Sequence, residues 1–534
     1  MIPILLRLRA AISWRFLTCV LLGGLGWCVV TAMASAAVYS GVVESVAPAA
    51  KSITIRVTST DKTMTFKLAP NAKVAIGTKN GDLGDVEEGQ SATVTTIGNG
   101  DVASRVTIRS TADAAAKPGA KAAPKTTKTK ATAATPSRVA AAAAAPGDWP
   151  QYRGPNRDNI STETGLLDRW PDEGPTLVWT RTGFGEGYSA VSVAGDAIYT
   201  LGSRGNDEML FAVDRESGNP KWAIRTGRNR DDGTGNGPRG TPTVDGELVY
   251  ALGANGDLVC AKTADGDIVW KLNILEEFQG SNIVWGISES VLIDGEKLIC
   301  TPGGRAATVV ALDKRTGRPV WRSLIQGAPQ AGYSSPIAID VGNVRQYVNF
   351  VHTAVVSVRA SDGEPMWGQR ASANGTANCS SPVAADDVVF TASGYDTGGA
   401  LFRLASRSNA TASEVVYTTK EMKNHHGGMV LLDGYVYGFD ESILTCLDLR
   451  TGKPAWQNRS VGKGSLTCAD GKLFLRSEGG PIALAIATPK GYEELGRFDQ
   501  PQRSGRPAWA HPVVAGGRLY IRDQDKLLAF DVRK

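Results

Sequence analysis

The sequence contains only 4 histidines among 534 residues, and it lacks the short motifs of several common enzyme classes. Few imidazole ligands are therefore available for a metal, and His425 and His426 are adjacent, so on a strand their rings would point to opposite faces. No Gly-x-Ser-x-Gly, His-Glu-x-x-His or Gly-Lys-Ser/Thr motif is present. Residues 235–240 match Gly-x-Gly-x-x-Gly, but Pro238 interrupts the segment and a strand is expected to follow it, which excludes a dinucleotide-binding turn.

Cysteine and helical periodicity are limited too. Beyond the N-terminal segment there are five cysteines, an odd number with no two close in sequence: Cys260, Cys300, Cys379, Cys446 and Cys468. We expect them to be small buried apolar side chains and not a redox pair. Helix-type periodicity is nearly absent after the N-terminus, whereas glycine is abundant at 61 residues. This combination predicts an all-β chain rich in turns.

Residues 1–36 have the pattern of a secretory signal. Three arginines precede an apolar stretch at 16–32, and Ala34-Ser35-Ala36 offers a small-x-small cleavage site. We expect cleavage and export to the periplasm or cell envelope. An uncleaved membrane anchor is the alternative, although the apolar stretch of about 17 residues is short for a membrane span.

The formal charge of +5 is unevenly distributed. Residues 1–36 contribute +3 and residues 111–147 contribute +5, which leaves −3 for the rest of the chain. The folded parts therefore lack the excess of basic residues expected of a nucleic-acid-binding protein. Residues 111–147 consist mainly of Ala, Lys, Thr and Pro and form a basic linker that cannot bury enough apolar surface to fold. This linker is either a soluble spacer or a contact to anionic cell-wall material or lipid headgroups. We expect membrane contact only through this linker or through the signal at residues 1–36.

Residues 37–110 alternate apolar and polar positions in short runs. About six strands are expected, separated by turns at sites such as Pro70-Asn71: Val38–Val46, Ser52–Thr58, Met64–Leu68, Lys73–Ile76, Ser91–Ile97 and Val102–Ile108. So many short strands in about 70 residues predict a small OB-like β-barrel module.

A repeated motif dominates residues 148–534. Three segments share the frame Ala/Cys-x-Asp-x-x-Ser/Thr-Gly-x-x-x-Trp, namely Ala212–Trp222, Ala311–Trp321 and Cys446–Trp456. Cys260–Trp270 and Ser357–Trp367 fit without the Asp, and three degenerate copies complete a series whose steps are 39 to 51 residues. A period of this length with four strands per unit predicts an eight-bladed β-propeller.

The C-terminus lies within a copy of the motif. It reads Ala529-Phe530-Asp531-Val532-Arg533-Lys534, and the missing Trp half occurs upstream in Thr176-Leu177-Val178-Trp179. We expect this N-terminal strand to complete the last blade and to close the ring, which removes exposed sheet edges. The motif tryptophans are expected to fill the wedges between blades as structural docking residues: Trp179, Trp222, Trp270, Trp321, Trp367 and Trp456.

The motif at Ala311–Trp321 resembles the tryptophan-docking repeat of pyrroloquinoline quinone (PQQ) dehydrogenase-like propellers, over about residues 148–534. The segments Trp149–Pro155 and Asn424–Gly428 are similar to those of exported PQQ-repeat proteins of planctomycete-type bacteria. The resemblance implies one of two roles. Quinoprotein dehydrogenases oxidise alcohols or sugars with PQQ and calcium, whereas non-catalytic members, such as the propeller subunit of the outer-membrane β-barrel assembly machinery, bind other proteins.

Two features common in such dehydrogenases, adjacent disulfide-forming cysteines and a Cys-x-x-Cys-His haem site, are absent from this sequence. The starts of the inner strands should gather at one mouth of the channel and form a polar and aromatic ring. The candidates for cofactor or ligand binding are Glu186, Tyr188, Arg239, Trp285, Glu289, Tyr333, Asn378, Asn424, His425, His426, Trp509 and His511. A merely solvated ring is the competing interpretation, because a propeller channel is wet.

If the resemblance extends to the dehydrogenases, some of these residues have expected roles. Glu289 and Asn378 could bind calcium, Arg239 could bind a quinone carboxylate, and His425 or His426 could act as a general base. The sequence assigns no catalytic residue. It favours an exported binding or scaffold protein that engages an envelope protein, a glycan or a small polar ligand at the mouth. A PQQ- and calcium-dependent dehydrogenase is the alternative.

Overall fold

The computed structural model describes residues 38–57, 62–76, 79–96, 101–108, 145–231, 233, 235–327, 330–407 and 410–534. The expected signal at 1–36 and most of the basic linker at 111–147 lie outside these ranges. The chain divides into two compact units, which are described separately.

The N-terminal unit is a small closed barrel. Its strands are β1 (Val38–Ala47), β2 (Ser52–Val57), β3 (Lys62–Ile76), β4 (Lys79–Asn80), β5 (Ser91–Thr96) and β6 (Val102–Ile108), with short 3-10 turns at Pro48–Ala50 and Leu83–Asp85. Pairing runs β1–β2–β3–β6–β5 and returns to β1, with β3 and β6 parallel. Alternate residues such as Ile53, Ile55 and Phe66 are fully buried inside, as the period of two predicts.

One prediction for this unit was wrong. The expected strands Met64–Leu68 and Lys73–Ile76 are parts of a single strand, β3. The Pro70-Asn71 pair does not end the strand, because the irregularity is absorbed by a register shift between Leu68 and Lys73 in the pairing with β6.

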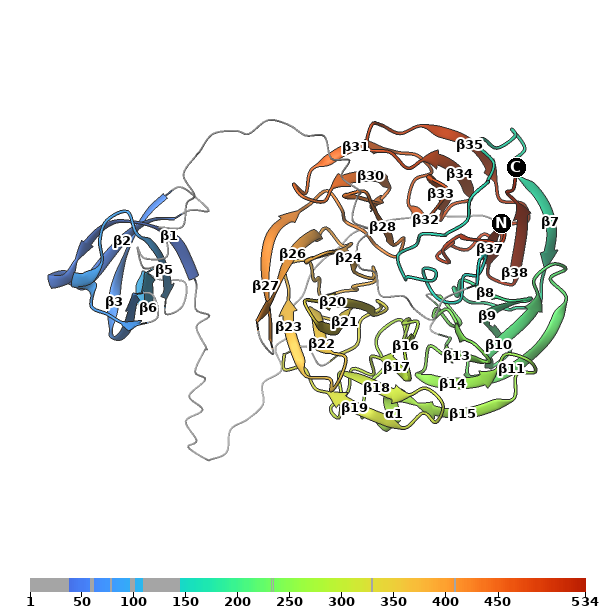
Figure 1. The fold of residues 1–534 in the computed structure, drawn as a ribbon, viewed down its shortest axis with the longest axis horizontal. Helices are drawn as coiled ribbons and strands as arrows, with labels where there is room; N and C mark the ends of the chain where they lie inside the picture. Colours follow the sequence, from blue (N-terminus) through green and yellow to red (C-terminus); the bar gives the residue numbers. More distant parts are fainter. Residues whose placement is uncertain are drawn as a thin grey trace, which may run out of the picture. The chain divides into compact units, whose positions relative to one another are not determined.

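The larger unit is a ring of eight four-stranded antiparallel sheets (Figure 1). This confirms the predicted fold class. We number the blades from the first inner strand. Blade 1 consists of β8 (Ser192–Ala194), β9 (Ala197–Arg204), β10 (Asp207–Asp214) and β11 (Pro220–Arg228), and blade 2 of β12 (Thr243–Asp245), β13 (Leu248–Leu252), β14 (Asp257–Lys262) and β15 (Ile268–Asn273). Blade 3 consists of β16 (Leu292–Asp294), β17 (Lys297–Cys300), β18 (Val309–Asp313) and β19 (Pro319–Ser323), and blade 4 of β20 (Ile337–Val341), β21 (Val344–Phe350), β22 (Val355–Arg359) and β23 (Pro365–Gln369).

Blades 5 to 8 follow the same plan. Blade 5 consists of β24 (Val383–Ala385), β25 (Val388–Ser393), β26 (Gly398–Arg407) and β27 (Ala410–Thr419), and blade 6 of β28 (Met429–Leu432), β29 (Tyr435–Asp440), β30 (Ile443–Asp448) and β31 (Pro454–Asn458). Blade 7 consists of β32 (Gly464–Ala469), β33 (Lys472–Ser477), β34 (Pro481–Ile486) and β35 (Glu494–Asp499), and blade 8 of β36 (Val513–Ala515), β37 (Arg518–Asp523), β38 (Lys526–Asp531) and β7 (Thr176–Arg181). A short helix, α1 (Ile274–Glu277), follows β15. No helix within the described ranges has the length and hydropathy needed to cross a membrane.

The ring closes as the sequence predicts. Strand β7 pairs antiparallel with β38, with Trp179 opposite Ala529 and Leu177 opposite Phe530. Blade 8 is therefore built from both ends of the propeller sequence, and the final sheet has no missing outer strand.

Four of the six motif tryptophans donate a hydrogen bond from their own blade to the next. Trp270 of blade 2 donates its Nε1–H to the backbone oxygen of Lys314 in blade 3 at 2.9 Å. Its ring also covers Gly317, where a Cβ would lie 2.7 Å from the ring. Gly317 has φ of +71°, so glycine is required twice, for the turn and for the approach of the ring. The same docking occurs in other blades, where Trp222, Trp321 and Trp456 bond Thr263, Ala360 and Thr488.

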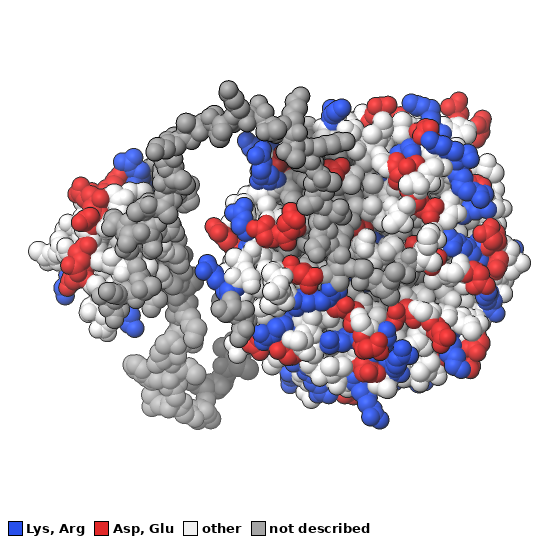
Figure 2. Space-filling model, viewed as in Figure 1, with Lys and Arg blue, Asp and Glu red and all other residues white. Residues whose placement is uncertain are grey.

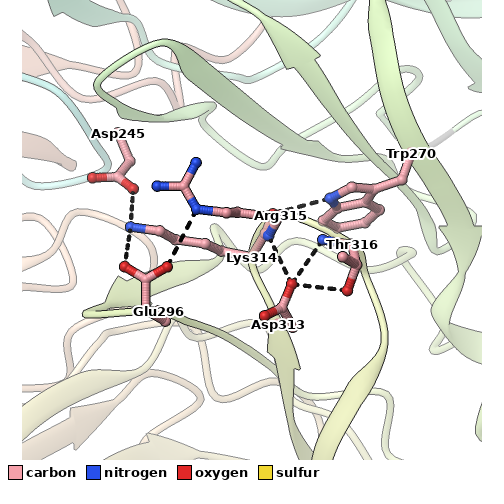
Figure 3. A network of polar contacts seen from close by, with 7 residues as sticks. All are labelled: Asp245, Trp270, Glu296, Asp313, Lys314, Arg315 and Thr316. Atoms are coloured by element: carbon pink, nitrogen blue, oxygen red, sulfur yellow. Dashed lines mark hydrogen bonds and ion pairs between the residues drawn. The ribbon is translucent and has the colours of Figure 1, made fainter.

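The rest of the motif supports this contact (Figure 3). Asp313 Oδ1 accepts hydrogen bonds from the backbone N–H groups of Arg315 and Thr316 and from the Thr316 hydroxyl. Lys314 lies 2.7 Å from Asp245 of blade 2 and 3.4 Å from Glu296 of blade 3. The turn is thus held by its own Asp, and its Lys joins two blades.

Blades that depart from the motif use substitutes. Blade 5 lacks the Trp, and Tyr417 takes its place by covering Gly452 and bonding Leu449 O at 2.7 Å. Blade 5 also lacks the motif turn, so Trp367 of blade 4 bonds Gln346 of its own blade.

Acidic and basic side chains are interspersed over the visible face (Figure 2).

Candidate functional site

The segments that precede the inner strands are joined from blade to blade by hydroxyl side chains. The Thr241 N–H donates to Ser290 Oγ at 2.8 Å, the Ser290 N–H to Ser335 Oγ at 2.9 Å, and the Ser335 N–H to Ser381 Oγ at 3.1 Å. These bonds link blades 2, 3, 4 and 5 in succession. They hold the adjacent side chains at one mouth of the channel in fixed positions.

The segment Trp149–Ser161, which we call the plug, crosses the interior of the ring before β7 (Figure 1). Arg153 is 2% exposed and donates to the backbone oxygens of Ser381, Pro382 and Met429. Arg157 is 4% exposed and donates to those of Ser290 and Val291. Further contacts of the plug reach Val193, Cys468 and Val514.

Pro150 of the plug also accepts a hydrogen bond from the Val244 N–H of blade 2. The plug therefore bonds inner-strand segments of blades 1, 2, 3, 5, 6, 7 and 8. Burial lowers the pKa of Arg157 to about 10, and the fields of Glu289 and Tyr152 oppose this shift while that of Arg153 adds to it. The guanidinium stays charged at neutral pH because it donates to carbonyl oxygens in place of water. The two arginines thus join the plug to blades 3, 5 and 6, which are far from it in the sequence.

A cavity of about 270 Å³ lies at the mouth above the plug. The residues around it come from seven of the eight blades and from Tyr152 of the plug. The lining consists of Tyr152, Tyr188, Ala190, Arg239, Thr241, Trp285, Ser288, Tyr333, Ser335, Ala377, Cys379, Tyr395, His425, His426, Trp509, Ala510 and His511.

Aromatic rings form most of the wall. Trp509 stacks on Tyr188 with ring centroids 4.2 Å apart, and Trp285 lies 5.6 Å from Tyr333. The wall continues through Tyr395, which meets His425 edge-on at 4.9 Å. Burial raises the pKa of Tyr188, Tyr333 and Tyr395, so these phenols are neutral near pH 7. The cavity is thus a predominantly apolar cup with hydrogen-bonding edges.

Two of the lining histidines are neutral. His511 donates from Nε2 to the backbone oxygen of His426 at 2.9 Å and accepts from Asn159 of the plug at Nδ1. Burial lowers the pKa of His511 to about 4 and that of His425 to about 3. His511 is therefore a satisfied structural histidine that positions the plug and the His426 backbone.

His426 contacts a carboxylate that sequence reasoning missed. Its Nε2 forms a hydrogen bond to Glu478, which also accepts from the Trp509 indole N–H at 2.9 Å. Burial alone would raise the pKa of Glu478, but the hydrogen bond and field of His426, with Lys463 at 3.6 Å, lower it overall. Glu478 is thus ionised, and it holds His426 and Trp509 in place from behind the wall.

The structure brings together eight of the twelve predicted ligand-binding candidates. These are Tyr188, Arg239, Trp285, Tyr333, His425, His426, Trp509 and His511. Four others lie outside the lining: Glu186, Glu289, Asn378 and Asn424. Glu186 is exposed, and Asn424 is buried and bonded to Phe439 O and Ser380.

Sequence reasoning also missed Tyr152, Cys379 and Tyr395 in the lining. Tyr152 lies in Trp149–Pro155, the segment similar to that of exported PQQ-repeat proteins. This similarity is the signal that could have placed Tyr152 at the site. Cys379 follows Asn378 at an inner-strand start, so the same spacing argument reaches it. Tyr395 lies between β25 and β26, away from the inner-strand starts, and no local pattern singles it out.

Comparison with known proteins identifies the repeat. A family model described as "Outer membrane protein assembly factor BamB" matches residues 206–458. The outer membrane protein assembly factor BamB of Burkholderia pseudomallei is 25% identical over 374 residues, which covers 65% of this chain and 85% of that protein. Residues 206–458 thus carry PQQ-like repeats.

Solved structures support the fold of this PQQ-like repeat propeller. The quinohemoprotein alcohol dehydrogenase of Comamonas testosteroni matches with a TM-score of 0.52 and 13% identity over 73% of this chain and 81% of that one. Quinohemoprotein alcohol dehydrogenase ADHIIG of Pseudomonas putida HK5 matches with a TM-score of 0.52 and 15% identity over 72% and 80%. At these identities the likeness concerns the fold.

The residues of this PQQ-like repeat propeller do not fit the expected calcium–PQQ arrangement. Glu289 is 3% exposed, its oxygens accept hydrogen bonds from Thr301 and Asn349, and burial raises its pKa to about 7. Asn378 uses its amide to bond Val351 O and His352 O and to accept from Asn374. Within the described ranges no three His, Cys, Asp or Glu side chains converge as a metal site.

Proposed function

We propose that this chain is a binding protein of the cell envelope whose propeller holds another envelope protein at the mouth cavity. The observation that carries the proposal is the aromatic cup closed below by the plug. The cup presents a recess to a partner, and its Tyr, Trp and Arg side chains are the types that dominate protein-binding hot spots. The similarity to an outer membrane assembly factor supports a protein partner, and the secretory pattern at residues 1–36 supports export.

Exposed apolar side chains beside the cavity favour the same role. Val284 is 70% exposed next to Trp285, and Tyr395 is 44% exposed while its ring lines the cavity. Apolar groups exposed around a recess are typical of an interaction surface. The alternative, oxidation of alcohols or sugars with PQQ, lacks comparable support because Glu289 and Asn378 use their polar atoms within the fold.

Crosslinking in the native host tests this proposal. A photoreactive phenylalanine analogue replaces Tyr395 at the mouth or, as a control, Val415, which is 39% exposed on outer strand β27 of the same blade. We expect the variant at position 395 to give one discrete envelope-protein adduct, identified by mass spectrometry, and the variant at 415 to give none. Equal labelling from the two positions would show that the mouth is not the binding surface.

A cofactor titration tests the alternative. The purified full chain is mixed with PQQ and calcium, and its thermal unfolding is followed. A cofactor that binds the folded state would stabilise it by about 2.7 kcal/mol at 100 times its Kd. We expect no shift. A saturable increase in Tm would instead support the dehydrogenase and overturn the binding role as the main function.

A further inference from the structure

Tyr395 differs from the other residues of the aromatic cup because its backbone is strained. Residues 394–397 form the turn between β25 and β26, closed by a hydrogen bond from the Thr397 N–H to the Gly394 oxygen at 3.2 Å. Tyr395 and Asp396 have φ of +55° and +56°. Among the described residues, Tyr395 is the only aromatic one with positive φ. Turns of this kind ordinarily use Asn or Gly, so the sequence keeps an unfavourable residue here.

The strained turn places the Tyr395 ring at the edge of the cavity. The ring lines the cavity although the residue is 44% exposed, and it meets His425 edge-on. Gly394 lets the two segments approach, since a Cβ there would lie 3.1 Å from the His425 ring. Asn or Gly at position 395 would relax the turn but remove the ring. Because strain retained beside a cavity is typical of ligand contacts, Tyr395 is expected to touch the occupant of the cup.

The other rings of the wall are tilted against one another. Trp285 and Tyr333 have their centroids 5.6 Å apart with planes at 50°, and Trp509 lies 5.6 Å from His426 with planes at 44°. A wall of tilted rings offers both faces and edges to a further ring. Edge-to-face and offset contacts stabilise ring pairs beyond the gain from buried area. The wall therefore favours an aromatic occupant over an aliphatic one of the same size.

Ionised groups of the wall have partners within the protein. Arg239 donates to the backbone oxygens of Gly235 and Gly237, and Glu478 is bonded to His426. A neutral occupant fits a wall in which these charges are already engaged, because it brings no charge that must lose its water.

The size of the cup limits the occupant to about one ring. An apolar cavity of about 150 Å³ holds benzene, whereas drug-sized molecules need about 300 Å³ or more. The cup, at about 270 Å³, lies between these values. The exposed apolar rim at Val284 and Tyr395 extends beyond it. A free ring would leave this rim uncovered, whereas the residues on either side of an inserted side chain would cover it.

We propose that the cup is a binding site for one aromatic side chain, Phe or Tyr, which the partner protein presents on an exposed segment. This inference rests on the proposed function and specifies the chemistry of the partner. Tyr395 contacts the inserted ring from the rim, and the residues that flank the ring in the partner lie over Val284 and Tyr395.

Peptide binding to the purified full chain tests the proposal. The probes are terminally blocked, uncharged pentapeptides: Gly-Ser-Phe-Ser-Gly, a shape control with cyclohexylalanine in place of Phe, and a control with Ala in its place. Tryptophan fluorescence reports binding, because Trp285 and Trp509 line the cup. We expect the cyclohexyl peptide to bind about two- to tenfold more weakly than the Phe peptide, because it lacks the ring–ring contacts. The Ala peptide should bind at least about tenfold more weakly, because it leaves the cup unfilled.

Variants of the strained turn separate binding from folding. Tyr395→Asn should weaken the Phe peptide about tenfold, and its melting temperature should not fall, because Asn adopts positive φ readily. Tyr395→Phe keeps the ring and should bind within about twofold of the parent. Glu441→Asn is the matched control: Glu441 has φ of +52° in the corresponding turn of blade 6, between β29 and β30, and lies outside the cavity lining. This control should bind all peptides as the parent chain does.

Several outcomes would overturn this proposal. Equal binding of the Phe and cyclohexyl peptides would remove the aromatic preference. Parent-like binding by Tyr395→Asn, or a large fall in its melting temperature, would show that Tyr395 serves the fold and not the ligand. Binding of 4-methylphenol or of maltotriose with no binding of the peptides would assign the cup to a free aromatic molecule or to a sugar. No peptide binding together with a discrete adduct from position 395 would refute the aromatic side chain and leave the proposed function standing, whereas loss of the adduct as well would refute both.

Discussion

At the scale of single residues, His511 shows how burial converts a titratable group into a structural one. Burial lowers its pKa from the ordinary 6.5 to about 4. Its hydrogen bond to the His426 backbone oxygen opposes this shift, and the charges of Arg153, His426 and Arg476 add to it. In the unfolded chain the imidazole binds a proton near pH 6.5, whereas in the folded protein it stays neutral until about pH 4. Acidification through this window therefore favours the unfolded state.

This linkage gives a measurable prediction. Between pH 7 and pH 5, titration of His511 should remove about 2 kcal/mol of folding free energy. Glu289 acts in the opposite direction, because its raised pKa of about 7 makes acidification stabilising. The test therefore compares His511→Gln with the parent chain by denaturant unfolding at both pH values. The variant should lose less stability on acidification than the parent, and identical losses would contradict the assignment.

Sequence reasoning was partly sufficient at this scale. The spacing of the inner strands led to His425, His426, His511 and Arg239, because residues before an inner strand must reach the mouth. It could not distinguish residues whose polar atoms face the cavity from those that bond their own blade, and Glu289 and Asn378 belong to the second group. That difference depends on side-chain rotamers and neighbours, which spacing does not encode.

At the scale of elements, the plug connects the blades from inside the ring. Arg153 satisfies three backbone oxygens in blades 5 and 6 at once. Arg153→Ala would leave these buried acceptors without a donor and should cost about 3 kcal/mol or more. Arg169→Ala is the matched control, because Arg169 is exposed and reaches Glu494 O only at 3.5 Å.

Thermal unfolding of the two variants separates the roles. The Arg153 variant should unfold at a clearly lower temperature than the parent, and its tryptophan fluorescence should shift because Tyr152 no longer closes the cup. The Arg169 variant should resemble the parent in both respects. Equal melting temperatures for the two variants would show that the plug lies in the ring without stabilising it.

The docking motif shows the same dependence between elements. Its Gly serves the turn of one blade and the Trp of the preceding blade, so one position satisfies two constraints. Blade 5 breaks the motif and still fits the ring, because Tyr417 reproduces both the covering ring and the hydrogen bond. The repeat could be predicted from the five motif copies, but this replacement could not, because Tyr417 has no motif around it.

At the scale of the whole molecule, stability depends on ring closure. Removal of residues 526–534 deletes β38 and leaves β37 and β7 with unpaired edges. We expect this truncated chain to lose cooperative unfolding and to self-associate through the open edges. Removal of residues 533–534 alone should preserve a monomeric, cooperatively unfolding propeller. Size-exclusion chromatography and circular dichroism check both expectations, and cooperative unfolding of the shorter chain would refute a structural role for closure.

The sequence by itself determined the number of blades, their closure and the mouth of the ring where most of the candidate site residues gather. These features follow from local patterns: a period of 39 to 51 residues, turn glycines and strand alternation. The tertiary structure alone decided that the channel is plugged, that Glu478 lies behind His426 and Trp509, and that Arg239 faces an aromatic cup. These features are contacts between residues far apart in the chain, and their energies depend on burial and geometry that exist only once the ring has closed.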